Sequence, residues 1–216
     1  MFEGLFLMPS NLQEWDEKHR TSAEHGLAEP ATIVRELLPI LPAGPVLDLA
    51  CGTGRHALLM AQNHRVVTAV DFSGVALDIL QQRAAALNIS SIRTEKTLQT
   101  GSVRNERVIA VQIDLERVEL PEKYFWVVIC TQYLQRSLFP AIARTLRPGG
   151  MLIFETFTKG QLDLQGGPRN PAYLLEREEL RTAFPELKTL FYRELLAEHA
   201  VASLLAQKTR RASAAR

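Results

Sequence analysis

The sequence is poor in cysteine, and its charges are almost balanced. Cys51 and Cys130 are the only two cysteines in 216 residues, which is too few for a disulfide framework and indicates a reducing compartment. Lysine and arginine total 25, aspartate and glutamate total 24, and the formal net charge is +1. This balance gives no general electrostatic footprint for nucleic acid, so we expect no nucleic-acid partner. Histidine and cysteine do not recur at metal-ligand spacing, and no metal site is expected.

Long apolar runs are also lacking. No stretch approaches the roughly 20 residues that a helix needs to cross a bilayer, so we expect no membrane association. Residues 1–8 are slightly apolar, but they lack a basic segment and are too short for a signal peptide. A cytoplasmic location is therefore expected. What the chain does have is 46% hydrophobic residues over 216 positions, enough for one α/β domain with a sizeable core.

The most informative stretch is 46–61, whose pattern is that of a strand, a glycine turn and a helix. An apolar run contains Asp48, a tight turn follows from Ala50 to Gly54, and helix-forming residues complete the stretch. Gly52 and Gly54 have no Cβ, so a ligand can approach the main chain closely. The first turn of the helix offers unpaired N–H groups and the positive end of the helix dipole. The stretch therefore predicts a site for a ligand with polar or anionic groups.

A second apolar run ends in Asp71, where a carboxylate can accept hydrogen bonds from ribose hydroxyls. Gly52, Gly54 and Ala57 also fit the dinucleotide fingerprint G-x-G-x-x-G/A, so a nicotinamide-dependent oxidoreductase is one alternative. Asp48 lies inside the first apolar run. Its charge would repel a pyrophosphate and attract an ammonium group, which argues against the dinucleotide.

Three ordered motifs resemble those of class I S-adenosylmethionine-dependent methyltransferases. They are Val-Leu-Asp-Leu-Ala-Cys-Gly-Thr-Gly-Arg at 46–55, Val-Thr-Ala-Val-Asp-Phe-Ser at 67–73 and Leu-Arg-Pro-Gly-Gly-Met-Leu-Ile at 146–153. The resemblance covers residues 31–205. It implies S-adenosylmethionine as cofactor, and it is strongest to the small-molecule branch, including the tellurite-resistance-type bacterial enzymes.

The order of elements predicts a doubly wound, Rossmann-like α/β fold. Apolar runs alternate with helices, two strands follow in succession near the end, and right-handed crossovers then place helices on both faces. We predict a seven-stranded, mostly parallel sheet in the order 3-2-1-4-5-7-6 with strand 7 antiparallel. Residues 1–42 would form lid or flanking helices, 43–206 the methyltransferase domain and 207–216 a basic, disordered tail. The polar stretch 94–107 is interpreted as a loop insertion.

The resemblance implies that the cofactor lies at the carboxyl ends of the first four strands. An acid after the third strand would take the adenine amino group, and the next main-chain N–H would reach a ring nitrogen. An arginine in the first helix, within Trp15-Asp-Glu-Lys-His-Arg20, would meet the cofactor's carboxylate. The expected cofactor-binding residues are Asp48, Ala50, Cys51, Gly52, Gly54, Asp71, Phe72, Asp114, Leu115, Thr131 and Arg20.

The acceptor side is predicted from the residues after the fourth strand, because open parallel sheets bind ligands at that edge. The stretch Thr131-Gln-Tyr-Leu lacks the Asn/Asp-Pro-Pro-Tyr/Phe signature of enzymes that methylate nucleic-acid amino groups, and no Pro-Cys nucleophile is present. We expect a small-molecule acceptor, with Arg136 and Arg169 favouring an anionic one. The expected acceptor-side residues are Trp15, Gln132, Tyr133, Arg136 and Arg169.

Methyl transfer from a sulfonium needs an in-line nucleophile and little else, so no catalytic side chain is demanded. Tyr133 and His19 are the two candidate general bases. A catalytically silent relative that binds the cofactor and a partner protein would carry the same motifs, and the sequence leaves this alternative open. Both a monomer and a homodimer are compatible with the sequence.

Overall fold

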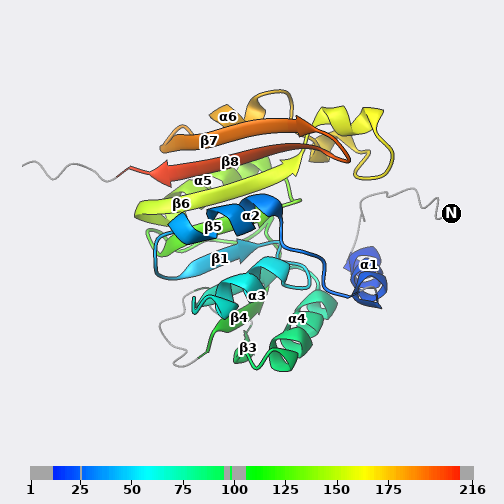
Figure 1. Cartoon of the computed structure of the whole chain (residues 1–216), viewed down its shortest axis with the longest axis vertical. Coiled ribbons are helices and arrows are strands. Elements are labelled where there is room, and N and C mark those ends of the chain that lie inside the picture. Colours follow the sequence, from blue (N-terminus) through cyan, green and yellow to red (C-terminus); the bar gives the residue numbers. More distant parts are fainter. Residues whose placement is uncertain (1–11, 25, 95–97, 99–105, 210–216) are drawn as a thin grey trace, which may run out of the picture.

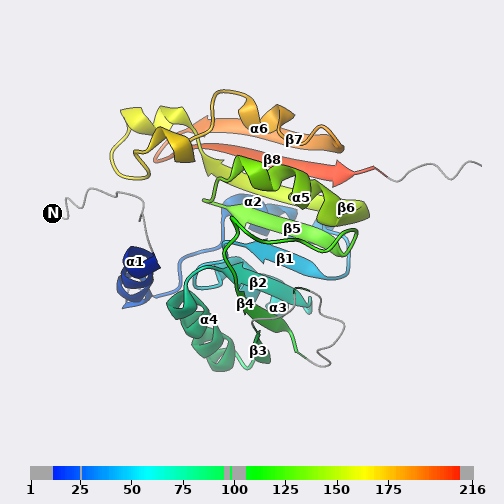
Figure 2. The ribbon, with the colours of Figure 1, turned by 180° about the vertical axis from the view of Figure 1, so that it is seen from behind.

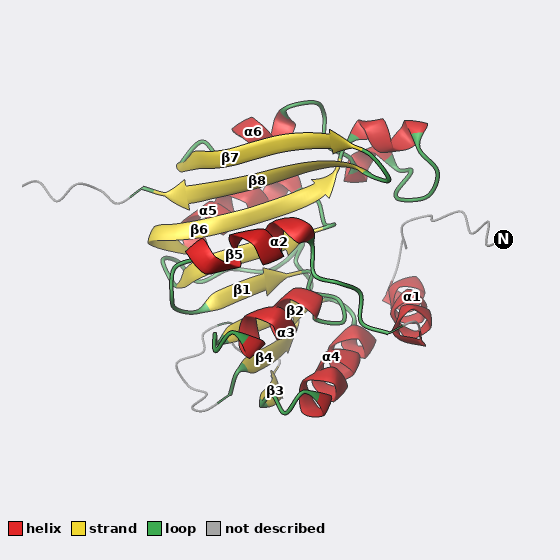
Figure 3. Ribbon diagram, in the orientation of Figure 1, coloured by secondary structure: helices red, strands yellow, loops and turns green. Residues whose placement is uncertain are grey.

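The apolar runs of the sequence become strands of one twisted sheet. In the computed structural model, which describes residues 12–24, 26–94, 98 and 106–209, helices pack on both faces of this sheet (Figures 1 and 3). The strands are β1 (Val46–Leu49), β2 (Val67–Asp71), β3 (Ser91–Thr94), β4 (Val108–Gln112), β5 (Phe125–Thr131), β6 (Leu146–Phe157), β7 (Leu187–Leu196) and β8 (Ala200–Lys208). The helices are α1 (Leu12–Glu24), α2 (Thr32–Leu37), α3 (Arg55–Gln62), α4 (Gly74–Ala86), α5 (Phe139–Thr145) and α6 (Glu179–Thr182), with 3₁₀ turns η1 (Leu38–Ile40), η3 (Arg136–Leu138), η4 (Lys159–Asp163) and η5 (Pro171–Tyr173).

The sheet contains the predicted strand order and one strand more. Its order is β3-β4-β2-β1-β5-β6-β8-β7, and β8 runs antiparallel to both β6 and β7. Without β3, this is the predicted 3-2-1-4-5-7-6, which is confirmed. The prediction of seven strands is corrected to eight in the described chain, because β3 adds a parallel edge strand beside β4. The sequence of β3 contains no apolar run that would predict a strand. Its one large apolar residue is Ile92, which is 40% exposed.

Alternate residues along the central strands enter two separate cores. On β5, Val128 and Cys130 pack in the core beneath α5 and α6, whereas Val127 and Ile129 pack in the core beneath α2, α3 and α4. Figures 1 and 2 show these two helical layers from opposite sides. Parallel strands buried on both faces read as continuous apolar runs, which is why these strands were visible in the sequence. The doubly wound fold class is thus confirmed.

One predicted boundary differs from the structure, and a second predicted segment lies mostly outside the described residues. Strand β8 continues to Lys208, whose Nζ donates a hydrogen bond to the carbonyl oxygen of Ala143 at 2.7 Å. The predicted tail therefore begins later than residue 207, and 210–216 lie outside the described residues. Most of the predicted insertion at 94–107 also lies outside them, but Leu98 is described and is buried. Within the described residues, no helix has both the length and the hydropathy of a membrane span.

Candidate functional site

A cavity of about 790 Å³ lies at the carboxyl ends of the parallel strands. It is centred on β1, which pairs with β2 on one side and β5 on the other, the point where the strand order reverses and where open α/β sheets bind ligands. Many predicted site residues line this cavity: Trp15, Ala50, Cys51, Gly52, Asp71, Phe72, Asp114, Leu115, Thr131, Gln132 and Tyr133. Their predicted contacts with a cofactor or an acceptor remain predictions.

The two glycines of the turn after β1 have different surroundings. Gly54 has φ +88° at the start of α3, and a Cβ there would lie 2.0 Å from Leu80 Cδ1, so this position needs glycine for helix packing. Gly54 is buried and does not line the cavity, which corrects the expectation that it contacts the ligand. A Cβ on Gly52 would meet only the His19 ring, at 3.3 Å. Gly52 lines the cavity, and the His19 ring bounds the space beside its Cα.

Asp71 is fixed at the end of β2 by two main-chain donors. Its Oδ2 accepts from the N–H of Gly52 at 2.7 Å, and its Oδ1 accepts from the N–H of Ser73 at 2.9 Å. Burial raises the pKa of Asp71, and these same two hydrogen bonds oppose that rise. Each carboxylate oxygen retains a second lone pair. Asp71 lines the cavity, so the fixed carboxylate is suited to accept hydrogen bonds from a ligand's hydroxyl groups.

Asp48 lies beneath the cavity, next to His56 of α3. It is 1% exposed and does not line the cavity, so direct contact with a cofactor is not what the structure shows. Its Oδ2 has no hydrogen-bond partner among the described residues. Burial raises the pKa of Asp48 to about 7, while the Arg55 charge opposes the rise. An unpartnered buried oxygen of this kind favours a cationic or hydrogen-donating group above it.

The protonation state of His56 follows from its partners. Its Nε2 accepts a hydrogen bond from the N–H of Ala31 at 3.1 Å, so the proton of the neutral ring is on Nδ1. That Nδ1 lies 3.4 Å from Thr131 Oγ1 and 4.0 Å from Asp48 Oδ1. Burial, with a smaller contribution from the Arg55 charge, lowers the pKa of His56 to about 3. His56 and Asp48 therefore do not form an ion pair at neutral pH, despite their proximity.

Helix α1 forms a wall of the cavity with one face. Trp15, Lys18, His19 and Ser22 line the cavity at helical spacing, and Trp15 stacks on His19 with ring centroids 5.7 Å apart. Arg20 lies off this face, 56% exposed, and pairs with Glu17 at 3.1 Å. The expectation that Arg20 meets the cofactor's carboxylate is thus wrong, because helical periodicity turns it to the solvent.

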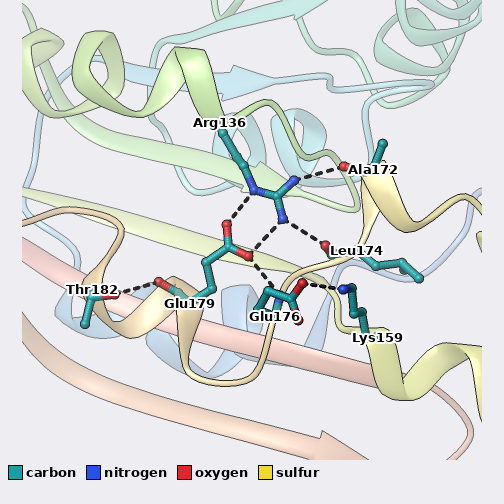
Figure 4. A network of polar contacts seen from close by, with 7 residues as sticks. All are labelled: Arg136, Lys159, Ala172, Leu174, Glu176, Glu179 and Thr182. Atoms are coloured by element: carbon teal, nitrogen blue, oxygen red, sulfur yellow. Dashed lines mark hydrogen bonds and ion pairs between the residues drawn. The ribbon is translucent and has the colours of Figure 1, made fainter.

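The two arginines expected at the acceptor side are occupied elsewhere, and neither lines the cavity. Arg136 makes a two-pronged ion pair with Glu179 (2.6 and 2.8 Å) and donates to the carbonyl oxygens of Ala172 (3.0 Å) and Leu174 (2.9 Å) (Figure 4). The hydrogen bond to Glu179 raises the pKa of Arg136 and lowers that of Glu179. Arg136 is thus a support of the loop 172–174.

Arg169 has a similar role in the preceding loop. Its guanidinium donates to the carbonyl oxygens of Gln161 at 3.3 Å, Leu162 at 2.8 Å and Leu164. The expectation that Arg136 and Arg169 select an anionic acceptor is corrected, because both guanidinium groups are committed to the protein itself.

Several cavity-lining residues were not identified from the sequence. Lys18 and Arg55 belong to quoted motifs but were given no role, and His56 directly follows one; the polar pair Arg55-His56 at the start of a mostly apolar helix was an available signal. Phe157, Tyr173 and His199 come from the chain after β5, and only the tertiary fold brings them to the cavity. We call the part lined by Trp15, Gln132, Tyr133, Phe157, Tyr173 and His199 the acceptor end, and the part lined by Gly52, Asp71 and Asp114 the cofactor end.

The adenine-side candidates follow β4. Asp114 Oδ1 accepts from the N–H of Glu116 at 2.9 Å, which fixes the carboxylate, and Leu115 is 6% exposed. Among the described residues, no group of three His, Cys, Asp or Glu side chains gathers as a metal site.

Several methyltransferases are similar to this chain. A family model described as a methyltransferase domain matches residues 46–150. A malonyl-[acyl-carrier protein] O-methyltransferase of Serratia marcescens is 27% identical over 175 residues, which cover 72% of this chain and 60% of the relative. A ubiquinone biosynthesis O-methyltransferase of Alkalilimnicola ehrlichii is 25% identical over 169 residues, 75% of this chain and 62% of the relative. The chain thus spans less than two thirds of the length of these relatives.

Solved structures share the fold. TehB from Haemophilus influenzae superposes with a TM-score of 0.68 at 17% identity, covering 90% of this chain and 67% of that one. Geranyl diphosphate C-methyltransferase from Streptomyces coelicolor A3(2), solved with S-adenosyl-L-homocysteine, gives a TM-score of 0.61 at 13% identity, covering 82% of this chain and 75% of that one. At these identities the likeness shows the fold.

Proposed function

We propose that this chain is a class I S-adenosylmethionine-dependent methyltransferase, as its match to a methyltransferase-domain family model over residues 46–150 supports, and that it transfers the methyl group of S-adenosylmethionine to a small-molecule acceptor. The observation that carries the proposal is the fixed Asp71 carboxylate, which lines the cavity beside Gly52 at the point where the strand order reverses. This arrangement offers hydrogen-bond acceptors to ribose hydroxyls.

The described residues fit the cofactor's groups. Asp71 would take the ribose hydroxyls, while Asp114 and the N–H of Leu115 would take the adenine edge. The unpartnered Oδ2 of Asp48 matches the cofactor's ammonium group through a bridging water, because Asp48 itself does not line the cavity. When bound, S-adenosylmethionine supplies an electrophilic methyl group on a positively charged sulfur. The acidic lining of the cofactor end suits that positive charge.

The protein's own task is to position the acceptor and to exclude water. Alignment of the reacting atoms supplies most of the acceleration in such a displacement, so a dedicated base is not required. Burial raises the pKa of Tyr133, and its hydroxyl donates to Gln135 Oε1 at 2.7 Å, so Tyr133 is a poor general base. Burial also lowers the pKa of His19, which leaves its ring neutral near pH 7 and able to accept a proton.

The walls of the acceptor end support a small acceptor. Residues of helix α1 and of the chain after β6 both line the cavity, and Figure 1 shows these two segments at the same edge of the sheet. A cavity of about 790 Å³ lies within the range of small-molecule sites. The named relatives differ in acceptor, one acting in ubiquinone biosynthesis and another on malonyl-[acyl-carrier protein], so the acceptor of this chain has to be found from its own pocket.

The proposal is tested by titrating the protein with S-adenosyl-L-homocysteine and, separately, with NAD, using calorimetry. We expect saturable one-site binding of S-adenosyl-L-homocysteine and none of NAD. Preferential binding of NAD would restore the oxidoreductase alternative. Binding of S-adenosyl-L-homocysteine without methyl incorporation into any compound of a broad acceptor panel would favour the catalytically silent alternative.

A further inference from the structure

The charged side chains of the cavity are unevenly distributed between its two ends. The acidic lining residues Asp71, Asp114 and Glu116 all lie where strands β2 and β4 end, at the cofactor end. The acceptor end contains aromatic and amide side chains. If the proposed function holds, the acceptor end must recognise its ligand mainly through these uncharged groups.

The cations near the acceptor end are already engaged. Arg136 and Arg169 hold main-chain carbonyl groups and lie outside the cavity lining. Lys18 lies over the Trp15 ring, with its Nζ 4.5 Å from the ring centroid, and burial lowers its pKa. Arg55 lines the cavity next to the glycine turn and donates to the carbonyl oxygen of Glu29 at 3.3 Å. Among the described residues that line the acceptor end, none carries a guanidinium group, the group that recognises a carboxylate or a phosphate with two parallel hydrogen bonds.

Aromatic rings form two walls of the acceptor end. On the α1 side, Trp15 lines the acceptor end, and its ring stacks at an interplanar angle of 25° on His19, which lies against Gly52 of the cofactor end. On the side of the chain after β6, Phe157 and His199 meet edge to face with centroids 5.7 Å apart, and Tyr173 is added by η5. Figure 1 shows α1 and the chain after β6 at the same edge of the sheet, on opposite sides of the β1 end. Such walls favour a planar ring, which gains stacking energy beyond its buried area.

A polar group sits where β5 leaves the sheet. Gln132 has φ +56°, its main-chain N–H donates to the carbonyl oxygen of Glu155 at 2.8 Å, and its side chain lines the cavity. An amide can donate to, or accept from, a hydroxyl group, and it does not select a charge. Gln132 adjoins Thr131 at the cofactor end, so it marks the place where an acceptor atom would meet the methyl group.

From the aromatic walls, the engaged cations and the position of Gln132, we propose that the acceptor is an uncharged aromatic compound whose ring hydroxyl is methylated. This inference rests on the proposed function and names its substrate class. The hydroxyl oxygen forms the new C–O bond as the methyl group's bond to sulfur breaks. The electron pair of the broken bond stays on sulfur, and the hydroxyl proton leaves to solvent. The products are an aryl methyl ether, S-adenosyl-L-homocysteine and a proton.

The test compares three small probes on the protein saturated with S-adenosyl-L-homocysteine, using saturation-transfer NMR. Catechol is the aromatic diol, trans-cyclohexane-1,2-diol is its saturated match, and succinate is the anionic probe. We expect catechol to bind at least about tenfold more tightly than either of the others, given two aromatic walls. Equal binding of catechol and the saturated diol, or tighter binding of succinate, would overturn the substrate class. If S-adenosyl-L-homocysteine itself does not bind, that result contradicts the proposed function and not the substrate class alone.

Variants then locate the binding. Tyr173→Leu and Trp15→Leu should each weaken catechol binding by about threefold to tenfold, the effect of losing one aromatic partner, and leave S-adenosyl-L-homocysteine affinity within about twofold. The matched control is Phe191→Leu, because Phe191 is an exposed aromatic residue of β7 outside the cavity. If Trp15→Leu disturbs α1, Tyr173→Leu still tests the site, because Tyr173 lies in η5 and not in α1. Unchanged catechol affinity in Tyr173→Leu, or equal loss in Phe191→Leu, would contradict the proposed site.

Discussion

At the scale of single residues, the site depends on side chains that hold main-chain groups as well as offering themselves to a ligand. Asp71 bonds to the N–H groups of Gly52 and Ser73, and His56 bonds to the N–H of Ala31. Gly52 and Gly54 lie two positions apart, yet only the first faces the cavity. Residue type and spacing identified the motif. The role of each glycine within it depends on which neighbouring residue its Cα packs against, Leu80 for Gly54 and His19 for Gly52.

Replacement of Asp71 tests the ribose-side assignment. Asp71→Ala should weaken binding of S-adenosyl-L-homocysteine by about 1.5–3 kcal/mol, the scale for hydrogen bonds to a charged group. The measurement is calorimetry on variant protein whose circular dichroism matches the parent. Glu36→Ala, at an exposed position of α2, is the control and should leave affinity unchanged. An Asp71→Ala protein with parental affinity would remove Asp71 from the binding site.

At the scale of elements, two hydrogen bonds join α1 and the residues that directly follow it to the region of α4. Asp16 accepts a hydrogen bond from Ser73 Oγ at the start of α4, and Arg83 of α4 donates to the carbonyl oxygen of Gly26 at 2.8 Å. These contacts hold the Trp15 face of α1 over the cavity. The wall on the opposite side is held by Arg136 and Arg169 in the same manner.

Breaking the α1 contact should affect the ligand more than the fold. Asp16→Ala removes the acceptor of the Ser73 hydroxyl, and we expect the affinity for S-adenosyl-L-homocysteine to fall by about 1 kcal/mol. The free energy of unfolding should change little, because α1 packs at the periphery of the sheet. Hydrogen exchange should speed up in α1 alone. Glu17→Ala, on the solvent side of the same helix, is the matched control; equal effects of the two variants would rule out a specific role for Asp16.

Removing Arg136 tests the opposite wall. Arg136→Ala should lower the free energy of unfolding by about 1–2 kcal/mol, because it frees Glu179 and two carbonyl groups at a half-exposed site. Trypsin cleavage after Arg169 and Arg177 should accelerate, while affinity for S-adenosyl-L-homocysteine stays parental. The control is Arg144→Ala, which removes a single exposed ion pair with Glu122 at 3.7 Å. A loss of cofactor affinity in Arg136→Ala would show that this residue acts on the cofactor end.

At the scale of the whole molecule, the sequence predicted the fold class and the order of the predicted strands, because both depend on apolar runs buried on two faces. It missed β3, whose edge position needs few apolar residues, and it placed Arg20, Arg136 and Arg169 at the ligand. The hydrogen-bond partner of an arginine side chain is the carboxylate or carbonyl group that the tertiary fold brings within its reach. Composition and spacing carry no information about that choice.

Stability against pH provides a test of the buried pair beneath the cavity. Burial raises the pKa of Asp48 to about 7, so its contribution to stability is lost as pH rises from about 4 to 7. Burial lowers the pKa of His56 to about 3, so its contribution is lost as pH falls from about 6.5 to 3. The two slopes are opposite in sign and largely cancel between about pH 4 and 6.5.

Single substitutions should separate the contributions of Asp48 and His56 to the pH dependence of the free energy of unfolding. In Asp48→Asn, the free energy of unfolding should gain about 2–3 kcal/mol relative to the parent on going from pH 4.5 to 6.5, because His56 then acts alone. In His56→Gln, the free energy of unfolding should instead fall relative to the parent between pH 4.5 and 6.5. Urea unfolding at the two pH values measures both, and other titrating groups cancel in the comparison with the parent. Parallel pH profiles in all three proteins would contradict the assigned pKa shifts.

The arginine supports of the acceptor wall have an evolutionary consequence. Arg136 and Arg169 hold the segment 161–174 through carbonyl oxygens, and every amino acid supplies a carbonyl oxygen whatever its side chain. These contacts do not depend on the side chains of Ala172 and Leu174, whereas Gly166 and Gly167, at positive φ, and Asn170, whose Oδ1 accepts from the N–H of Ala172 at 3.0 Å, fix the path of the segment through their own residue types. Selection can replace the side chains that face the acceptor while the loop keeps its path. Such a separation lets one scaffold acquire new acceptors by point substitution, without insertions or loss of the cofactor site.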